Sequence, residues 1–215
     1  MNLSNRFKNI HKGKSIAIIG SGPSAILYDE DQDISIGVNG ASRLGPHFTY
    51  YMCGDSCSDK RDWFFVNCSD VRIIGNVIAT MDEIIFPSEM FPKIDRFSVK
   101  VLNNPRLKNV PEPIKPHFVF PYQMIYGKTM SKDQKYLYAG ATISGCALQM
   151  AHIMGSTDIH LYGCDFTHDQ GKYFYNTENH GFVRDSQLKE MKSLINKLKD
   201  IGLTITVHGD SKLNE

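Results

Sequence analysis

The chain has 215 residues, of which 41% are hydrophobic, and its 24 basic and 23 acidic residues give a formal net charge of +1. This length and apolar content can bury one substantial core, so we expect residues 1–215 to form a single α/β domain and not a disordered chain. The near-neutral charge gives no field that would gather nucleic acid, and no apolar run reaches membrane-spanning length. We therefore expect a cytoplasmic protein with at most peripheral membrane contact.

The N-terminal region opens with a strand that breaks into a glycine turn. Residues 15–19 are a short apolar run, and the turn Gly20-Ser21-Gly22-Pro23-Ser24 follows it. Glycine lets a ligand approach the main chain closely, and proline suits the first position of a helix whose N–H groups could face an anion. The turn lacks the third glycine of a dinucleotide fingerprint and the Gly-Lys-Ser/Thr end of a P-loop. The turn therefore argues against NAD and against a P-loop. Its glycines could also serve turn geometry alone.

Three further strands are predicted at 34–38, 48–52 and 71–74. Small polar residues follow the first three strands of the chain, among them Ser21, Asn39 and Asp55. Because the carboxyl ends of parallel strands meet at one edge of a sheet, these side chains are expected to line one crevice. Residues 87–122 hold seven of the nine prolines, which predicts an irregular insertion or small lid.

The second half of the chain returns to a regular pattern. Ile143-Ser144-Gly145 leads into a helix over 146–154, with Ser144 as its N-cap or as a ligand donor. A strand at 158–162 ends before Asp165, a helix is expected over 185–201, and a last strand over 203–207. The segment 169–182 is predicted to be a lid loop. Together these elements indicate a Rossmann-like, doubly wound, mostly parallel sheet.

The five cysteines include no Cys-x-x-Cys pair and are odd in number. We expect reduced, buried thiols and no metal site. Zinc held by Cys53, Cys57 and Cys68 or a histidine is the alternative, but it lacks a second matching pair.

Three motifs together resemble a known family. Gly20-Ser21-Gly22-Pro23-Ser24, Ile143-Ser144-Gly145, and the segment 161–166 with Tyr173 downstream resemble the bacterial lipooligosaccharide sialyltransferases that use CMP-sialic acid. The outline is also similar to the flagellin-modification and archaeal 6-hydroxymethylpterin diphosphokinase-like proteins, which share the Gly-Pro-Ser turn.

The sialyltransferase resemblance implies a nucleotide site. It places the nucleotide against Ser21 and Gly22, with Asn39 near the ribose or sugar phosphate. Ser144 and Gly145 would contact the donor phosphate or carboxylate, and Asp165 would shape the cytidine pocket.

The same resemblance implies catalytic residues. Tyr173 matches a tyrosine that hydrogen-bonds the leaving phosphate, Thr167 stands in place of a second tyrosine, and His180 matches the histidine base. Asp55 falls where the family has asparagine, Ile143 replaces a threonine, and the family's arginine has no counterpart at Ala141. The acceptor should therefore differ from the family's.

Three functions follow as hypotheses. The first is metal-independent, inverting transfer of a sugar from a CMP-activated donor to a glycan acceptor without a cofactor. The second is a magnesium- and ATP-dependent diphosphokinase of the 6-hydroxymethylpterin type, with Asp55 and Asp165 at the metal or phosphate site. The third is a catalytically degenerate nucleotide-binding module. A homo-oligomer is compatible with each.

Overall fold

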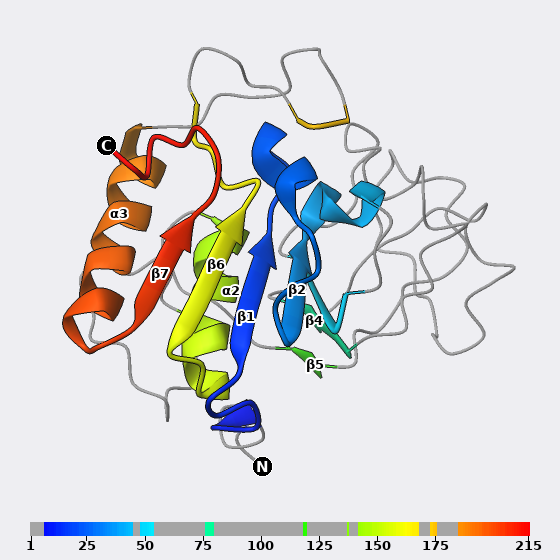
Figure 1. The fold of residues 1–215 in the computed structure, drawn as a ribbon, viewed down its shortest axis with the longest axis vertical. Coiled ribbons are helices and arrows are strands. Elements are labelled where there is room, and N and C mark those ends of the chain that lie inside the picture. The colour runs from blue at the N-terminus through cyan, green and yellow to red at the C-terminus, as the bar shows by residue number, and fades with distance from the viewer. Residues whose placement is uncertain are drawn as a thin grey trace, which may run out of the picture.

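The computed structural model describes residues 7–44, 48–53, 76–79, 118–119, 137, 142–167, 173–175 and 185–215. They form a seven-stranded parallel sheet of order β5-β4-β3-β2-β1-β6-β7 (Figure 1). The predicted α/β class and Rossmann-like sheet are confirmed. The strands are β1 (Ser15–Ile19), β2 (Ile34–Val38), β3 (Tyr50–Cys53), β4 (Asn76–Ala79), β5 (Phe118–Val119), β6 (Asp158–Tyr162) and β7 (Thr204–Val207).

The predicted and observed strands differ most in the middle of the chain. β1, β2 and β6 have the predicted bounds, whereas the strand predicted at 71–74 lies outside the described residues and β4 occupies 76–79. Within 87–122, which was predicted to be irregular, Phe118–Val119 forms β5. Phe118 pairs with Ile78 of β4, so sheet pairing decides the conformation of a segment whose prolines indicate none.

The order of the strands creates a topological switch next to β1. The chain runs outward from β1 to β5 and then returns to place β6 on the other side of β1. Ile16 therefore pairs with Ile34 on one side and with Ile159 on the other, both in parallel register. Sheets of this kind bind ligands beyond the carboxyl ends of the strands at the switch, here between β1 and β6.

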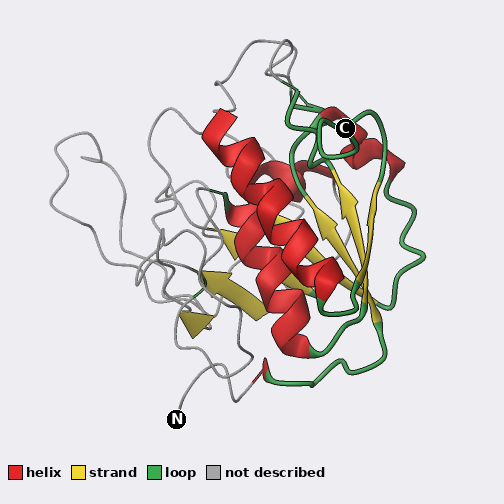
Figure 2. Ribbon diagram, turned by 90° about the vertical axis from the view of Figure 1, so that its left-hand side faces the viewer, coloured by secondary structure: helices red, strands yellow, loops and turns green. Residues whose placement is uncertain are grey.

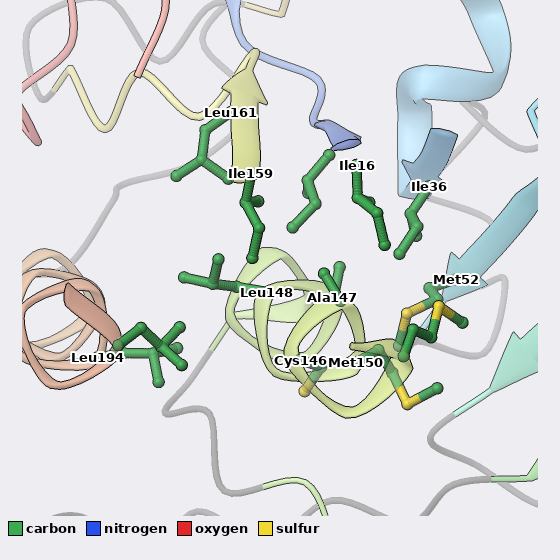
Figure 3. Packing of buried hydrophobic residues seen from close by; sticks show 14 of the residues in the cluster. Ile16, Ile36, Met52, Cys146, Ala147, Leu148, Met150, Ile159, Leu161 and Leu194 are labelled. Atoms are coloured by element: carbon green, nitrogen blue, oxygen red, sulfur yellow. The ribbon is translucent and has the colours of Figure 1, made fainter. Parts of the chain in front are cut away.

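The two α-helices in the described part of the chain cover one face of the sheet. In Figure 1, helix α2 (Ile143–Met154) lies behind β6 and β1, and helix α3 (Asp185–Asp200) stands beside β7. Figure 2 shows the two helices next to each other on the same side of the sheet. Ala147 and Leu148 of α2 face the isoleucines of the sheet, and Leu194 of α3 points toward the same core (Figure 3). In α3 the apolar stripe is buried at Met191, Leu194, Ile195 and Leu198, as its periodicity predicts. Helix α2 is buried at every position from Gly145 to Met154, so its periodicity does not mark the buried side.

The connection from β1 to β2 contains a short 3₁₀ helix, η1 (Pro23–Leu27), where the sequence predicted an anion-facing helix. Gly22 is its N-cap and Pro23 its first residue, as expected. Residues 20–33 connect β1 to the parallel strand β2, so they return the chain to the amino end of the sheet. A second 3₁₀ helix, η2 (Asn39–Leu44), follows β2. A five-residue helix carries little dipole, so η1 alone makes no anion site.

In the part of the chain that the structure describes, no helix combines the length and apolar character needed to cross a membrane.

Candidate functional site

The glycine turn after β1 packs directly against the end of β6. The N–H of Gly20 donates to the Tyr162 carbonyl at 2.7 Å, and the N–H of Gly22 donates to the Gly163 carbonyl at 2.9 Å. A methyl group at position 22 would overlap Asp165 Oδ2 and lie 2.8 Å from the Gly163 carbonyl oxygen. The close approach of two chain segments therefore requires glycine here.

Ser24 joins the two strand ends. Its main-chain N–H donates to Asp165 Oδ2 at 3.0 Å, and its hydroxyl accepts from the N–H of Gly163 at 2.9 Å. The N–H predicted to face an anion is thus bound by a carboxylate of the protein itself. Ser24 holds the switch point together, which is a structural role that the sequence left open.

Asp165 is the buried charge of the site, with 4% of its surface exposed. Its second oxygen, Oδ1, is buried and has no hydrogen-bond partner in the structure as described. Burial raises the pKa of Asp165, the Asp210 charge raises it further, and the hydrogen bonds from Ser24 oppose both effects. A buried acceptor without a partner is costly, which makes Asp165 the strongest ligand-binding candidate among the described residues.

Ser144 reaches the same strand end from α2. Its hydroxyl hydrogen-bonds Cys164, whose sulfur would lie 3.4 Å from a methyl group at Gly20. The N-cap of α2 is Thr142, not Ser144: Thr142 Oγ1 accepts from the N–H of Gly145 at 3.1 Å. Both residues are good caps, and the extended backbone of Thr142 decides between them. The Gly145 N–H, which the resemblance places at the donor phosphate, is thus bound within the helix cap.

A tyrosine covers the ends of β1 and β2. A methyl group at Gly40 would overlap the Tyr175 hydroxyl and lie 2.8 Å from Ser21 Oγ, so both oxygens face Gly40. The N–H of Phe174 donates to the Ser21 carbonyl at 3.0 Å. Asn39, directly after β2, has the left-handed φ of 46° that asparagine tolerates well. Ser21 therefore lies against Gly40, the residue that follows Asn39, whereas Asp55, the third residue of the expected crevice, lies outside the described residues.

Tyr173 lies in the same short segment and stacks on Tyr175, with ring centroids 5.1 Å apart. The hydroxyl that lies against Gly40 is that of Tyr175, a residue the sequence did not distinguish from its neighbours. Thr167 is partly buried at the end of the described segment 142–167. Asp55 and His180 lie outside the described residues, as does most of the predicted lid 169–182.

The two described cysteine side chains are free thiols in the core. Burial raises the pKa of both Cys146 and Cys164 to about 12, so neither is a thiolate nucleophile at neutral pH. Across residues 7–44, 142–167, 185–215 and the shorter described stretches, no cluster of three or more metal-ligating side chains occurs.

Comparison with known proteins supports the fold. No family model matches the sequence, and no curated protein matches it. A solved structure entitled MAf glycosyltransferase from Magnetospirillum magneticum AMB-1 is similar, with a TM-score of 0.51 and 12% identity over 97% of this chain. The chain spans 38% of that protein. At this identity the likeness is one of fold, and the sialyltransferase resemblance stays a prediction.

Proposed function

We propose that the chain is a glycosyltransferase that takes its sugar from a CMP-activated donor and transfers it to a glycan acceptor. The grouping at the β1–β6 switch carries the proposal: Ser21, Ser144 and the buried Asp165 carboxylate come from three segments to one edge of the sheet. Nucleotides bind at such switch points. The fold shared with a glycosyltransferase adds support.

The charges of the site favour one orientation of the nucleotide. Asp165 Oδ1 is an acceptor that would bind an N–H or O–H group, as on cytosine or ribose, and would repel a phosphate. The first turn of the 12-residue helix α2, with the Ser144 hydroxyl beside it, offers a phosphate the positive end of a helix dipole. We therefore place the nucleoside at Asp165 and the phosphate toward Ser144.

The proposed reaction is inverting and needs no metal. The acceptor hydroxyl loses its proton to His180 and attacks the anomeric carbon, while the bond from that carbon to the phosphate oxygen breaks. Tyr173 donates a hydrogen bond to the departing CMP, which lowers the energy of its developing charge. Tyr175 is a second donor for this role, because its hydroxyl lies over the ends of β1 and β2.

A thermal-shift panel tests the proposal. Ligands that bind only the folded chain raise the melting temperature, by an amount equivalent to about 2.7 kcal/mol at a hundred times Kd. We expect CMP and CDP to raise it and ATP with magnesium not to. Stabilisation by ATP with magnesium alone would instead support the diphosphokinase, and no response to any nucleotide would contradict the proposal.

Calorimetry with Asn39→Ala then tests the position of the site. The variant should bind CMP more weakly than the wild type, because the side chain at the end of β2 is lost. Undiminished affinity would remove Asn39 from the site.

A further inference from the structure

The turn that carries Asp165 has an unfavourable backbone. Gly163 and Phe166, on either side of Cys164 and Asp165, both have left-handed φ angles, of 62° and 53°. Glycine adopts this conformation freely, but a phenylalanine does so only when its surroundings hold it there. Some other part of the chain must therefore fix the turn.

The segment after β7, residues 208–213, supplies that support. The N–H of His208 donates to the Leu161 carbonyl at 2.9 Å, and the N–H of Lys212 donates to the Asp165 carbonyl at 2.8 Å. Between them, the Ser211 hydroxyl lies 2.9 Å from the Cys164 carbonyl oxygen and 3.1 Å from that of Asp165. Figure 1 shows the segment, in red, folding back over the end of β6.

Ser211 is the centre of this support. It is buried, with 4% exposed, and its oxygen also accepts from the N–H of Leu213 at 3.1 Å. The same segment contacts the other side of the Asp165 hydrogen bond, because a methyl group at Gly209 would overlap Ser24 Cβ. Residues 208–213 thus hold the main chain of Asp165 and pack against its partner Ser24.

We infer that Ser211 is a positioning residue of the nucleotide site, which holds the main chain of Asp165 so that its carboxylate stays beneath Gly22. The inference rests on the proposed function for the identity of the ligand. The hydrogen bonds of Ser211 do not depend on that function. Ser211 touches no substrate in this scheme. It acts through the main-chain carbonyls of Cys164 and Asp165.

Ser156 is a matched control at the opposite edge of the sheet. Its hydroxyl lies 2.8 Å from the carbonyl oxygens of Lys14 and Asp158 and accepts from the Asp158 N–H at 3.2 Å. It is 1% exposed. Ser156 therefore makes the same kinds of hydrogen bond in the same degree of burial, at the amino end of β6 and away from Asp165.

The experiment compares Ser211→Ala with Ser156→Ala in the full chain. Urea unfolding should show a similar loss of stability in both, because each loses one buried hydroxyl. CMP affinity should fall about tenfold in Ser211→Ala and stay near the wild-type value in Ser156→Ala, with Ser211→Thr restoring it. Equal affinities in the two alanine variants would overturn the inference.

An NMR titration of the Asp165 carboxyl group in ligand-free protein separates this inference from the proposed function. The wild-type pKa is raised by burial and by Asp210, which is the charged group that faces the carboxylate from residues 208–213. Burial is the largest of the effects on this pKa and outweighs the hydrogen bonds from Ser24. Loosening the segment exposes the carboxylate, so the Asp165 pKa should fall in Ser211→Ala and not in Ser156→Ala. An unchanged pKa in Ser211→Ala contradicts the positioning role. If the Asp165 pKa is lowered in Ser211→Ala but the wild-type protein binds no CMP, only the proposed function is contradicted.

Discussion

The Asp165 carboxylate occupies the space in which a side chain at Gly22 would lie. The two residues lie far apart in the sequence and meet because β1 and β6 are neighbours in the sheet. The glycine turn that resembles a nucleotide-binding motif therefore also allows the ends of β1 and β6 to pack closely. Its glycines serve both ligand approach and packing. The predictions below separate the two.

Gly22→Ala should destabilise the fold by about 2 kcal/mol or more, because the new methyl group overlaps Asp165 Oδ2. The double variant Gly22→Ala/Asp165→Ala lacks the overlapping carboxylate and should recover part of the lost stability. The restoration stays incomplete because the Gly163 carbonyl oxygen, 2.8 Å from the methyl group, belongs to the main chain. Urea unfolding of the single and double variants measures the coupling, and strictly additive losses would contradict the overlap.

Asp165→Asn should weaken CMP binding and stabilise the ligand-free protein at neutral pH. The folded-state pKa of Asp165 is raised, so its contribution to stability is full below the unfolded value near 3.8 and is lost as pH rises through the folded value. Asparagine carries no charge and still accepts from Ser24. Between pH 4 and pH 7.5 the unfolding free energy should therefore change in a more positive direction in the variant than in the wild type, because ionisation of Asp165 no longer opposes the effect of the buried histidines. An equal change in the two proteins would argue that the carboxylate is solvated.

The histidine pair between β6 and β7 predicts acid sensitivity. His160 Nδ1 lies 2.9 Å from His208 Nε2, and Tyr162 stacks on the His208 ring at 4.0 Å. Burial and the neighbouring His160 lower the pKa of His208, so its stabilising effect is full above the unfolded value of 6.5 and is lost as pH falls below it.

His208→Gln should therefore reduce the loss of stability between pH 7.5 and 5.5. Burial also lowers the pKa of His11, so part of the acid sensitivity should persist in the variant and be reduced further in His11→Gln/His208→Gln. Urea unfolding at the two pH values provides the measurement. If the free energy of unfolding of the wild type is the same at pH 7.5 and pH 5.5, the prediction is wrong.

His180→Ala should lower donor turnover by the ~10²–10⁴-fold typical of a lost general base and leave CMP affinity nearly unchanged. Tyr173→Phe should have a smaller effect, because one hydrogen bond is lost and the ring remains. Turnover should be unaffected by EDTA, as expected of a metal-independent reaction. Wild-type turnover in His180→Ala would exclude it as the base, and loss with EDTA that magnesium restores would favour the diphosphokinase.

The strands at the switch could be predicted from the sequence because the residues that mark each strand are adjacent in the chain. β1, β2 and β6 are apolar runs that end in glycine or small polar residues, and this pattern alone marks their bounds. The choice of Thr142 over Ser144 as the cap depended on a single extended backbone angle. β5 depended on its partner β4, which no local pattern reveals.

The candidate site was predictable only in outline. Strand ends placed Ser21, Asn39 and Asp165 on one edge, but Tyr173 and Tyr175 are two residues apart in an irregular segment and no period tells which hydroxyl faces the strands. Ser211 carries no sequence signal, because it acts on carbonyls 46 and 47 residues away. Its role becomes visible only when β7 lies beside β6.

The central position of β1 also bears on how the protein is made. Ser24 and its partner Asp165 are 141 residues apart. During synthesis, one edge of β1 therefore stays unpaired until β6 has been made. Its residues Ile16 to Ile19 are all apolar, and an unpaired strand of this kind is a template for another copy. Chains that stop before β6 should therefore aggregate, and slower synthesis at low temperature should raise the yield of folded protein.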